Sequence, residues 1–171
     1  MQRTLELINQ MQADGVIGEY AIGGAVGATL YLEPSATLDV DVFVMLPKVS
    51  ESSLISLSPI YDYLEKRGGK AEGEHIVIGG WPVQFLAPAN KLEQEALQEA
   101  VETEVETERT YVMSAEHLAA IALQTGPPKD FARILQFLEH RAVNMEKLTH
   151  IVKRHGLERK WENFKQRFLN E

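Results

Sequence analysis

Two aspartates separated by one residue are the side chains in this sequence best placed to do chemistry. Asp39 and Asp41 lie in LDVDVFVML, whose alternating pattern is typical of a β-strand. The alternation sends both carboxylates to one face of the strand. Two carboxylates so placed can hold a hard divalent cation such as Mg²⁺ and leave coordination positions for phosphate oxygens. The pair therefore predicts a magnesium site that also takes a phosphate group.

A Gly-Gly bend precedes this strand. Gly23 and Gly24 follow a short strand-like segment, residues 19–22, and come before a segment expected to be helical, residues 25–32. Glycines let the backbone approach a ligand closely, and free amides at a helix start stabilise phosphate. The bend and the aspartates together predict a site for a nucleoside triphosphate with Mg²⁺. Metal ions there would clamp the attacking and leaving oxygens of an in-line displacement.

The strand that carries the aspartates, residues 38–46, is expected to be central in its sheet. One of its faces is wholly apolar, and the aspartate face also carries Phe43 and Met45. Both faces therefore require cover by other elements. Two unpaired acids on such a strand would be costly without a cation or donors nearby. We therefore expect both aspartates to be buried and to serve a function.

Two other phosphate sites fit the sequence poorly. GGAVGA follows a strand, but it has the order G-G-x-x-G and not the G-x-G-x-x-G of dinucleotide-binding folds. The acids also lie within the next strand and not at its end. The sequence contains no G-K-[ST], which excludes a P-loop.

The remaining elements suggest an α+β fold. EHIVIGG and WPVQFL predict a hairpin that turns at Gly79-Gly80, and residues 101–113 suit a strand or a second hairpin. Ser58 is expected to cap a helix over residues 59–67. From Ser114 onwards the pattern is helical throughout. We therefore expect a mixed β-sheet with flanking helices over residues 1–112, followed by a small helical bundle over residues 113–171.

Composition narrows the functional classes. The sequence has no cysteine, which excludes thiol nucleophiles, disulfides and zinc–thiolate sites. Residues 1–126 hold 7 Lys and Arg against 19 Asp and Glu, a net charge of −12, whereas residues 127–171 hold 10 against 6, a net charge of +4. The negative charge of residues 1–126 argues against a non-specific nucleic-acid binder. No apolar run is long enough to cross a membrane, and we expect a cytoplasmic location.

The segment IGGAVGATLYLEPSATLDVDVFV resembles the signature of the DNA-polymerase-β-like nucleotidyltransferase superfamily. In that signature an apolar residue and Gly-Gly or Gly-Ser precede Asp-x-Asp after a gap. The sequence looks most similar to small bacterial proteins related to the AbiEii toxins of type IV toxin–antitoxin pairs. In those proteins a helical segment with "EHL" and "KD" recurs, and here Ser114–Leu118 and Pro128–Asp130 match it. The resemblance covers about residues 18–140.

The resemblance implies a nucleotidyltransferase-like fold and a role for each matching residue. Gly23 and Gly24 would contact the triphosphate, Asp39 and Asp41 would bind Mg²⁺ and act in catalysis, and Lys129 would meet a phosphate. The expected reaction transfers a nucleotidyl group from a nucleoside triphosphate to an acceptor hydroxyl. The acceptor stays open between RNA, a protein and a small molecule. An antitoxin or a second copy of the chain stays open as a partner.

Two departures from the signature favour a second hypothesis. Ser35 stands where relatives carry an arginine, and Gln84 stands where active members carry a third carboxylate. An amide oxygen ligates a metal weakly and cannot take a proton at neutral pH. Substitutes on the preceding strand are Glu72, Glu74 and His75. The alternative is therefore a catalytically degenerate binding module or a component of a toxin–antitoxin pair.

A third hypothesis concerns the basic C-terminal helices, which would bind an RNA acceptor. Their cations are Arg133, Arg141, Lys153, Arg154 and Lys160. Binding of that kind weakens steeply with salt.

Overall fold

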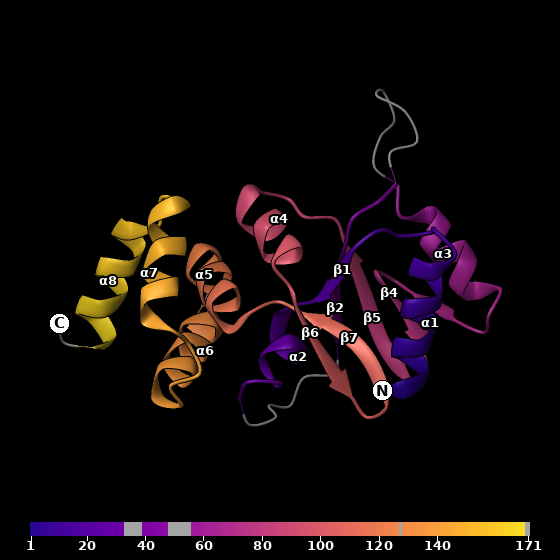
Figure 1. Cartoon of the computed structure of the whole chain (residues 1–171), viewed down its shortest axis with the longest axis horizontal. Coiled ribbons are helices and arrows are strands. Elements are labelled where there is room, and N and C mark those ends of the chain that lie inside the picture. The colour runs from indigo at the N-terminus through magenta and orange to yellow at the C-terminus, as the bar shows by residue number, and fades with distance from the viewer. Residues whose placement is uncertain (33–38, 48–55, 127, 170–171) are drawn as a thin grey trace.

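A computed structural model describes residues 1–32, 39–47, 56–126 and 128–169 of the chain (Figure 1). Ser35 and Leu38, the first residue of the predicted aspartate strand, therefore lie outside the described residues. The described strands are β1 (Tyr20–Ile22), β2 (Val40–Val44), β3 (Lys70–Glu72), β4 (His75–Ile78), β5 (Trp81–Leu86), β6 (Val101–Val105) and β7 (Glu108–Val112). The described helices are α1 (Gln2–Ala13), α2 (Gly24–Ala28), α3 (Ser58–Glu65), α4 (Lys91–Gln98), α5 (Ala115–Thr125), α6 (Pro128–Glu139), α7 (Met145–Arg154) and α8 (Glu158–Phe168).

The strands form one mixed sheet in the order β3-β4-β5-β2-β1-β7-β6. β2 lies in the middle, antiparallel to β1 and parallel to β5, which confirms that the aspartate strand is central. The predicted hairpin appears as β4 and β5, and residues 101–112 form the hairpin of β6 and β7. The chain therefore has the expected α+β fold.

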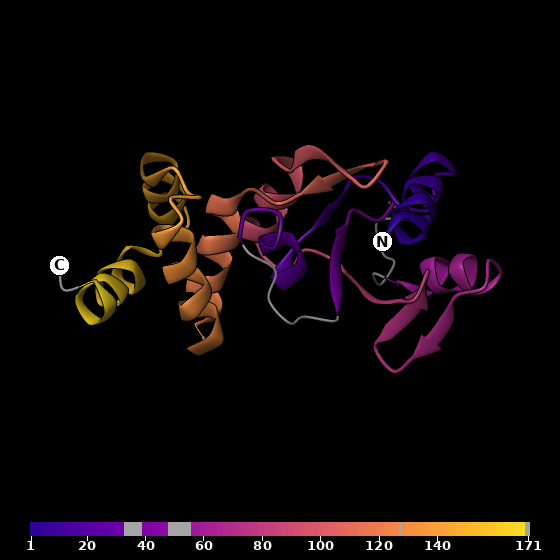
Figure 2. The ribbon, with the colours of Figure 1, turned by 90° about the horizontal axis from the view of Figure 1, so that it is seen from below.

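The two faces of the sheet belong to two apolar cores. Val40, Val42 and Val44 point to the face covered by α1 and α3. Phe43 and Ala21 point to the opposite face and share a core with α4 and the C-terminal helices. In Figure 2 the helices α5–α8, in orange to yellow, extend away from the sheet at the end opposite to α1. Because Asp41 alternates with these valines, its side chain lies on the face towards the C-terminal helices.

Local sequence signals explain where the helices around this second face begin and end. Asn90 caps α4 by accepting a hydrogen bond from the Glu93 amide, and Ser114 caps α5 by accepting one from the His117 amide. α5 ends at Gly126, which has a φ of 79°. α6 follows directly, and its first turn therefore starts close to the end of α5. Among the described residues, no helix is long and apolar enough to span a membrane.

Some boundaries differ from those expected. Leu57, and not Ser58, occupies the N-cap position of α3, and Ser58 is the first residue of the helix. The helix after the bend is short, Gly24–Ala28, because residues 29–32 continue as turns. A strand that we did not expect, β3, follows Gly68-Gly69 and pairs with β4. The division of the chain at residue 112 stays a prediction.

Candidate functional site

The Gly-Gly bend packs directly on the aspartate strand. The Gly23 amide donates a hydrogen bond to the Asp41 carbonyl oxygen at 2.9 Å. Gly24 has a φ of +57°, and a Cβ placed there would lie 2.0 Å from Asp41 Oδ2. A Cβ on Gly23 would lie 2.8 Å from the Phe43 ring. Both glycines are therefore needed for the bend to approach the Asp41 carboxylate, and bend and carboxylate lie on the same side of the sheet.

Asp41 is a partly buried acid on a central strand. Burial raises the pKa of its carboxyl above the usual range, and the negative charge of Asp39 raises this pKa further. The positive charges of His75, Arg133 and Lys129 lower the same pKa and offset part of the rise. In the folded protein, nearby positive charges therefore offset only part of the cost of ionising Asp41. A carboxylate with such a shifted pKa is a candidate for a functional site.

Asp39 departs from the expectation that both aspartates are buried. β2 begins only at Val40, and the Asp39 side chain is 57% exposed. It lies directly before the first residue of the strand, where water reaches it. Its ion-pair partner among the described residues is His75, whose Nε2 lies 3.8 Å from Asp39 Oδ2. The cost of burial that suggested a function applies to Asp41 alone.

Gln84 lies beside Asp41. The parallel register of β2 and β5 pairs these two residues, so their side chains share one face of the sheet. Among the described residues, no third carboxylate joins Asp39 and Asp41 with all ligand atoms within 4.8 Å. Glu72 and Glu74 are exposed, in and beside the tight turn between β3 and β4. The position next to Asp41 therefore carries a neutral amide.

Lys129 and Arg133 lie one helical turn apart on α6. Lys129 is exposed in the first turn, and Arg133 pairs with the buried Asp130 at 3.3 Å. Both cations lower the pKa of Asp41, so both act on the same region of space. Sequence reasoning assigned Lys129 to a phosphate but considered Arg133 only for RNA. The i, i+4 spacing of the two cations is the signal that could have identified it.

The donors at this site fit a hard divalent cation. Asp39 and Asp41 offer carboxylate oxygens, and Gln84 offers an amide oxygen in register with Asp41. The space that a Cβ on Gly24 would fill is occupied by Asp41 Oδ2. The oxygen donors present are therefore of the kind that Mg²⁺ takes.

A second acidic cluster lies between α4 and the C-terminal helices. Glu95 accepts hydrogen bonds from Arg154 at 2.6 Å, from His155 at 3.0 Å and from His117 at 3.1 Å. Burial raises the pKa of Glu95, but these hydrogen bonds and the charge of Arg154 outweigh it and lower the pKa to about 2. Glu95, Glu99 and His117 have ligand atoms within 4.8 Å of one another. Because Arg154 already contacts Glu95 Oε1, this cluster is neutralised by the chain's own cations.

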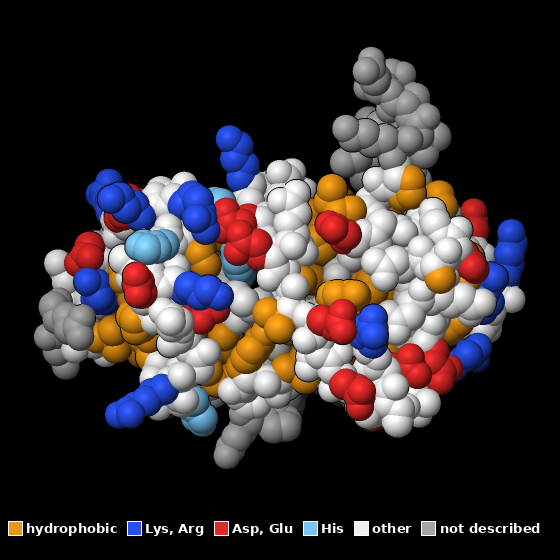
Figure 3. All heavy atoms as spheres, in the orientation of Figure 1, with side chains coloured by type: hydrophobic (Ala, Val, Ile, Leu, Met, Phe, Trp, Pro, Cys, Tyr) orange, Lys and Arg blue, Asp and Glu red, His pale blue; other side chains and the backbone are white. Residues whose placement is uncertain are grey.

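The basic C-terminal helices show mixed charges. Figure 3 shows Lys and Arg side chains gathered over the helical end of the molecule, interspersed with acids. Three of the cations considered for RNA bind within the chain: Arg133 to Asp130, Arg154 to Glu95, and Lys160 to the Gln124 carbonyl oxygen. These contacts reduce the positive charge available to an RNA backbone, so the RNA hypothesis gains no support from the fold.

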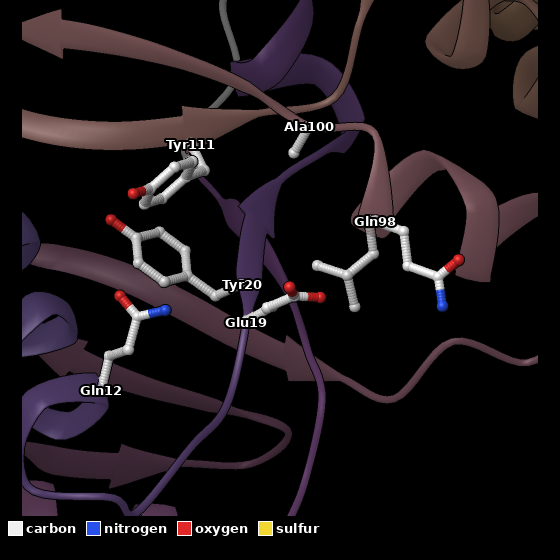
Figure 4. A pocket seen from close by; sticks show the side chains of 7 residues that line it. Gln12, Glu19, Tyr20, Gln98, Ala100 and Tyr111 are labelled. Atoms are coloured by element: carbon white, nitrogen blue, oxygen red, sulfur yellow. The ribbon is translucent and has the colours of Figure 1, made fainter.

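A cavity of about 280 Å³ lies away from the predicted site residues (Figure 4). It opens between α1, β1, β7 and the end of α4, and it is lined by Gln12, Glu19, Tyr20, Leu97, Gln98, Ala100 and Tyr111. Tyr20 and Tyr111 meet edge to face with ring centroids 5.6 Å apart. We call Gly23, Gly24, Asp39 and Asp41 the diglycine–aspartate site. The cavity contains none of these residues.

Comparison with known structures shows which proteins have a similar fold. No protein-family model matches the sequence, and neither does any curated protein. The structure is similar to that of an antigenic nucleotidyltransferase-like protein from Paracoccidioides brasiliensis, with a TM-score of 0.58, 14% identity and coverage of 98% of this chain and 88% of that chain. It is also similar to the antibiotic-resistance factor ANT(2'')-Ia, with a TM-score of 0.51, 16% identity and coverage of 99% and 98%.

These likenesses confirm the expected nucleotidyltransferase-like fold and extend over nearly the whole chain. Identities this low establish the architecture and leave the chemistry to the residues of the site. The narrower resemblance to AbiEii-related proteins stays a prediction.

Proposed function

We propose that this protein binds a nucleoside triphosphate with Mg²⁺ at the diglycine–aspartate site and transfers its nucleotidyl group to an acceptor hydroxyl. The observation that carries the proposal is the packing of the Asp41 carboxylate against Gly24, where a Cβ would lie 2.0 Å from Oδ2. An acid whose charge is costly in the folded protein thus lies beside two glycines, within a nucleotidyltransferase-like fold.

The chain's own residues have distinct parts in this proposal. Asp39 and Asp41 would hold the metal, and Gly23 and Gly24 would admit the triphosphate to the bend. Lys129, with Arg133 one turn further on α6, would face the phosphate oxygens. Bound Mg²⁺ would offset the charge that develops on the triphosphate.

In the reaction the acceptor oxygen forms a bond to the α-phosphorus. The bond from that phosphorus to the bridging oxygen breaks, and pyrophosphate leaves. The hydroxyl proton passes to solvent water. Gln84 cannot accept it, because an amide does not protonate at neutral pH.

Nucleotide binding tests the first part of the proposal. Isothermal titration of ATP, CTP, GTP and UTP with Mg²⁺ should show binding of at least one nucleotide to the wild type. Asp41→Asn, which keeps the side-chain volume, should weaken this binding at least about tenfold, a loss of about 1.4 kcal/mol. Asp62→Asn, an exposed position on α3, is the matched control and should bind as the wild type does. Equal binding by the wild type and Asp41→Asn, or binding by neither, contradicts the proposal.

A catalytically degenerate binding module is the second candidate, and the pairing of Gln84 with Asp41 favours it. Such a protein would bind nucleotide but transfer none to RNA, to protein or to small acceptors. The test adds labelled nucleotide and each acceptor class to the wild type and to Gln84→Asp. Transfer by the wild type eliminates the degenerate module, whereas transfer gained only by Gln84→Asp supports it.

A further inference from the structure

The cavity in Figure 4 lies where the pairing between β1 and β7 ends. Within the described residues, these parallel strands pair only at Ile22 and Val112, whereas all three residues of β1 pair with β2. Tyr20 and Tyr111 precede that single pair along their strands and line the cavity of about 280 Å³. The short pairing therefore leaves a space between the two strands and the end of α4.

The walls of this cavity are largely aromatic and aliphatic. Leu97 and Tyr20 are almost fully buried, and Ala100 and Tyr111 are partly buried. The hydroxyl groups of both tyrosines have hydrogen-bond partners within the chain, so their rings offer apolar surface. An apolar protein cavity of about 150 Å³ holds a benzene molecule. The larger volume here therefore suffices for one six-membered ring with a short substituent.

Glu19 gives the cavity its charge. Its side chain is exposed, and it forms no ion pair or hydrogen bond with any described residue. Figure 4 shows the Glu19 carboxylate between Tyr20 and Gln98. Gln12 donates through Nε2 to the Gly18 carbonyl oxygen at 3.1 Å, which leaves its Oε1 as a further acceptor. The cavity therefore offers hydrogen-bond acceptors and one negative charge beside its apolar walls.

This lining favours a cation over an anion or a neutral ligand. Among the described residues, no lysine, arginine or histidine lines the cavity, so an anion would meet only the repulsion of Glu19. An ammonium group gains from the carboxylate and from the faces of nearby aromatic rings. Because Glu19 is exposed, an ammonium group beside it keeps part of its water and avoids most of the cost of burial.

We propose that this cavity binds a small organic ammonium ion, a six-membered ring that carries its amino group on a short arm. The ring lies against Tyr111 and Leu97, and the ammonium group meets Glu19. Glu19 and Gly23 are four residues apart on a nearly extended chain, a separation of about 13 Å. This binding site is therefore separate from the diglycine–aspartate site, and the inference does not depend on the proposed function.

Benzylamine, which is protonated at neutral pH, is the probe that tests this inference. It is titrated into the ¹⁵N-labelled full chain, and the amide signals are followed by NMR. We expect saturable shifts at Tyr20, Leu97 and Tyr111. Benzyl alcohol, the neutral compound of similar shape, should bind about fivefold more weakly, and benzoate should show no saturable binding. No saturation by benzylamine below about 10 mM, or saturable shifts only outside the cavity, overturns the inference.

Three variants test the role of each part of the cavity. Glu19→Gln should weaken benzylamine binding at least about threefold and leave benzyl alcohol binding unchanged, since only the ammonium group meets the carboxylate. Glu65→Gln, an exposed acid at the end of α3, is the matched control and should bind both compounds as the wild type does. Ala100→Leu fills part of the space and should abolish saturable binding of both.

The same titrations can refute the proposed ligand class. Equal affinity of the wild type for benzylamine and benzyl alcohol overturns the preference for an ammonium group. Benzylamine binding that Glu19→Gln leaves unchanged overturns the role of the carboxylate. Benzylamine binding that Ala100→Leu retains places the ligand outside the cavity and overturns the inference as a whole.

Discussion

Two partly buried carboxylates of this protein are treated in opposite ways by their surroundings. Asp41, on the central strand, has a raised pKa because burial and the charge of Asp39 disfavour its ionised form. Glu95, between α4 and the C-terminal helices, has a pKa lowered to about 2, because hydrogen bonds from Arg154, His117 and His155 outweigh its burial. The fold supplies cations to one acid and leaves the other incompletely compensated.

The contrast separates an acid that the chain's own cations neutralise from an acid for which we propose a ligand role. Glu95 connects three helices through side chains of the same chain, so its charge stabilises the folded state. Asp41 lies against a bend without side chains, and burial makes its charge costly in the folded protein. Functional sites commonly contain residues that lower the stability of the folded protein.

The largest effect is expected at the bend. Gly24→Ala would place a Cβ 2.0 Å from Asp41 Oδ2 at a φ of +57°, so either the bend or the carboxylate must move. We expect a loss of about 2–3 kcal/mol in the free energy of unfolding, measured by chemical denaturation. Gly73→Ala is the control, because Gly73 has a φ of +63° with nothing within 4 Å, and it should lose only about 1 kcal/mol. Equal losses would show that the contact with Asp41 does not constrain Gly24.

The next largest effect is expected when the negative charge of Glu95 is removed. Glu95→Gln takes the carboxylate away from Arg154 and both histidines and should lower the free energy of unfolding at neutral pH by about 2 kcal/mol. Glu99→Gln should change it by less than about 0.5 kcal/mol, since the Glu99 side chain is 59% exposed. Thermal denaturation of both variants measures the difference. If Glu95→Gln leaves the free energy of unfolding unchanged, Glu95 does not stabilise the folded protein and its contrast with Asp41 is wrong.

The pH dependence of this difference follows from the sign of the Glu95 shift. The folded pKa, about 2, lies below the ordinary value of 4.5. The stability that ionised Glu95 contributes is therefore fully present above pH 4.5 and is lost as the pH falls towards 2. The gap in melting temperature between wild type and Glu95→Gln should narrow over this range, and a gap that stays constant would contradict the lowered pKa.

A smaller effect of opposite sign is expected at Asp41. Its folded pKa is raised, so the folded state is relatively less stable at pH values where Asp41 is ionised. Asp41→Asn should therefore increase the free energy of unfolding of the metal-free protein at pH 7 by about 1 kcal/mol. This gain should disappear below pH 3.8, the ordinary pKa of an aspartate, where the wild-type acid is protonated in both states. Destabilisation by Asp41→Asn at pH 7 would place Asp41 in the same class as Glu95.

Local patterns predicted much of the fold and part of the site. The alternation around Asp41 and the glycines of the bend act over a few residues, so the sequence alone indicates them. The resemblance to nucleotidyltransferases placed Gln84 at the position of a third carboxylate, and the register of β2 and β5 pairs it with Asp41.

Properties that depend on tertiary contacts could not be predicted from the pattern. Asp39 is exposed because β2 starts at Val40, two residues later than predicted, and strand ends depend on pairing partners. His75 reaches Asp39 only because β4 and β5 lie on the same side of β2 in the sheet. Glu95 gains its partners from helices more than twenty residues away, which no local spacing reveals.

The titration of Asp41 tests the central claim most directly. Carboxyl ¹³C NMR of the labelled protein, with the signal assigned by its absence in Asp41→Asn, gives the pKa of this side chain with and without a divalent cation and nucleotide. The account predicts a pKa above the ordinary value of 3.8 in the free protein and a clear decrease when cation and nucleotide are added. An ordinary pKa in the free protein, or one that neither ligand changes, would contradict it.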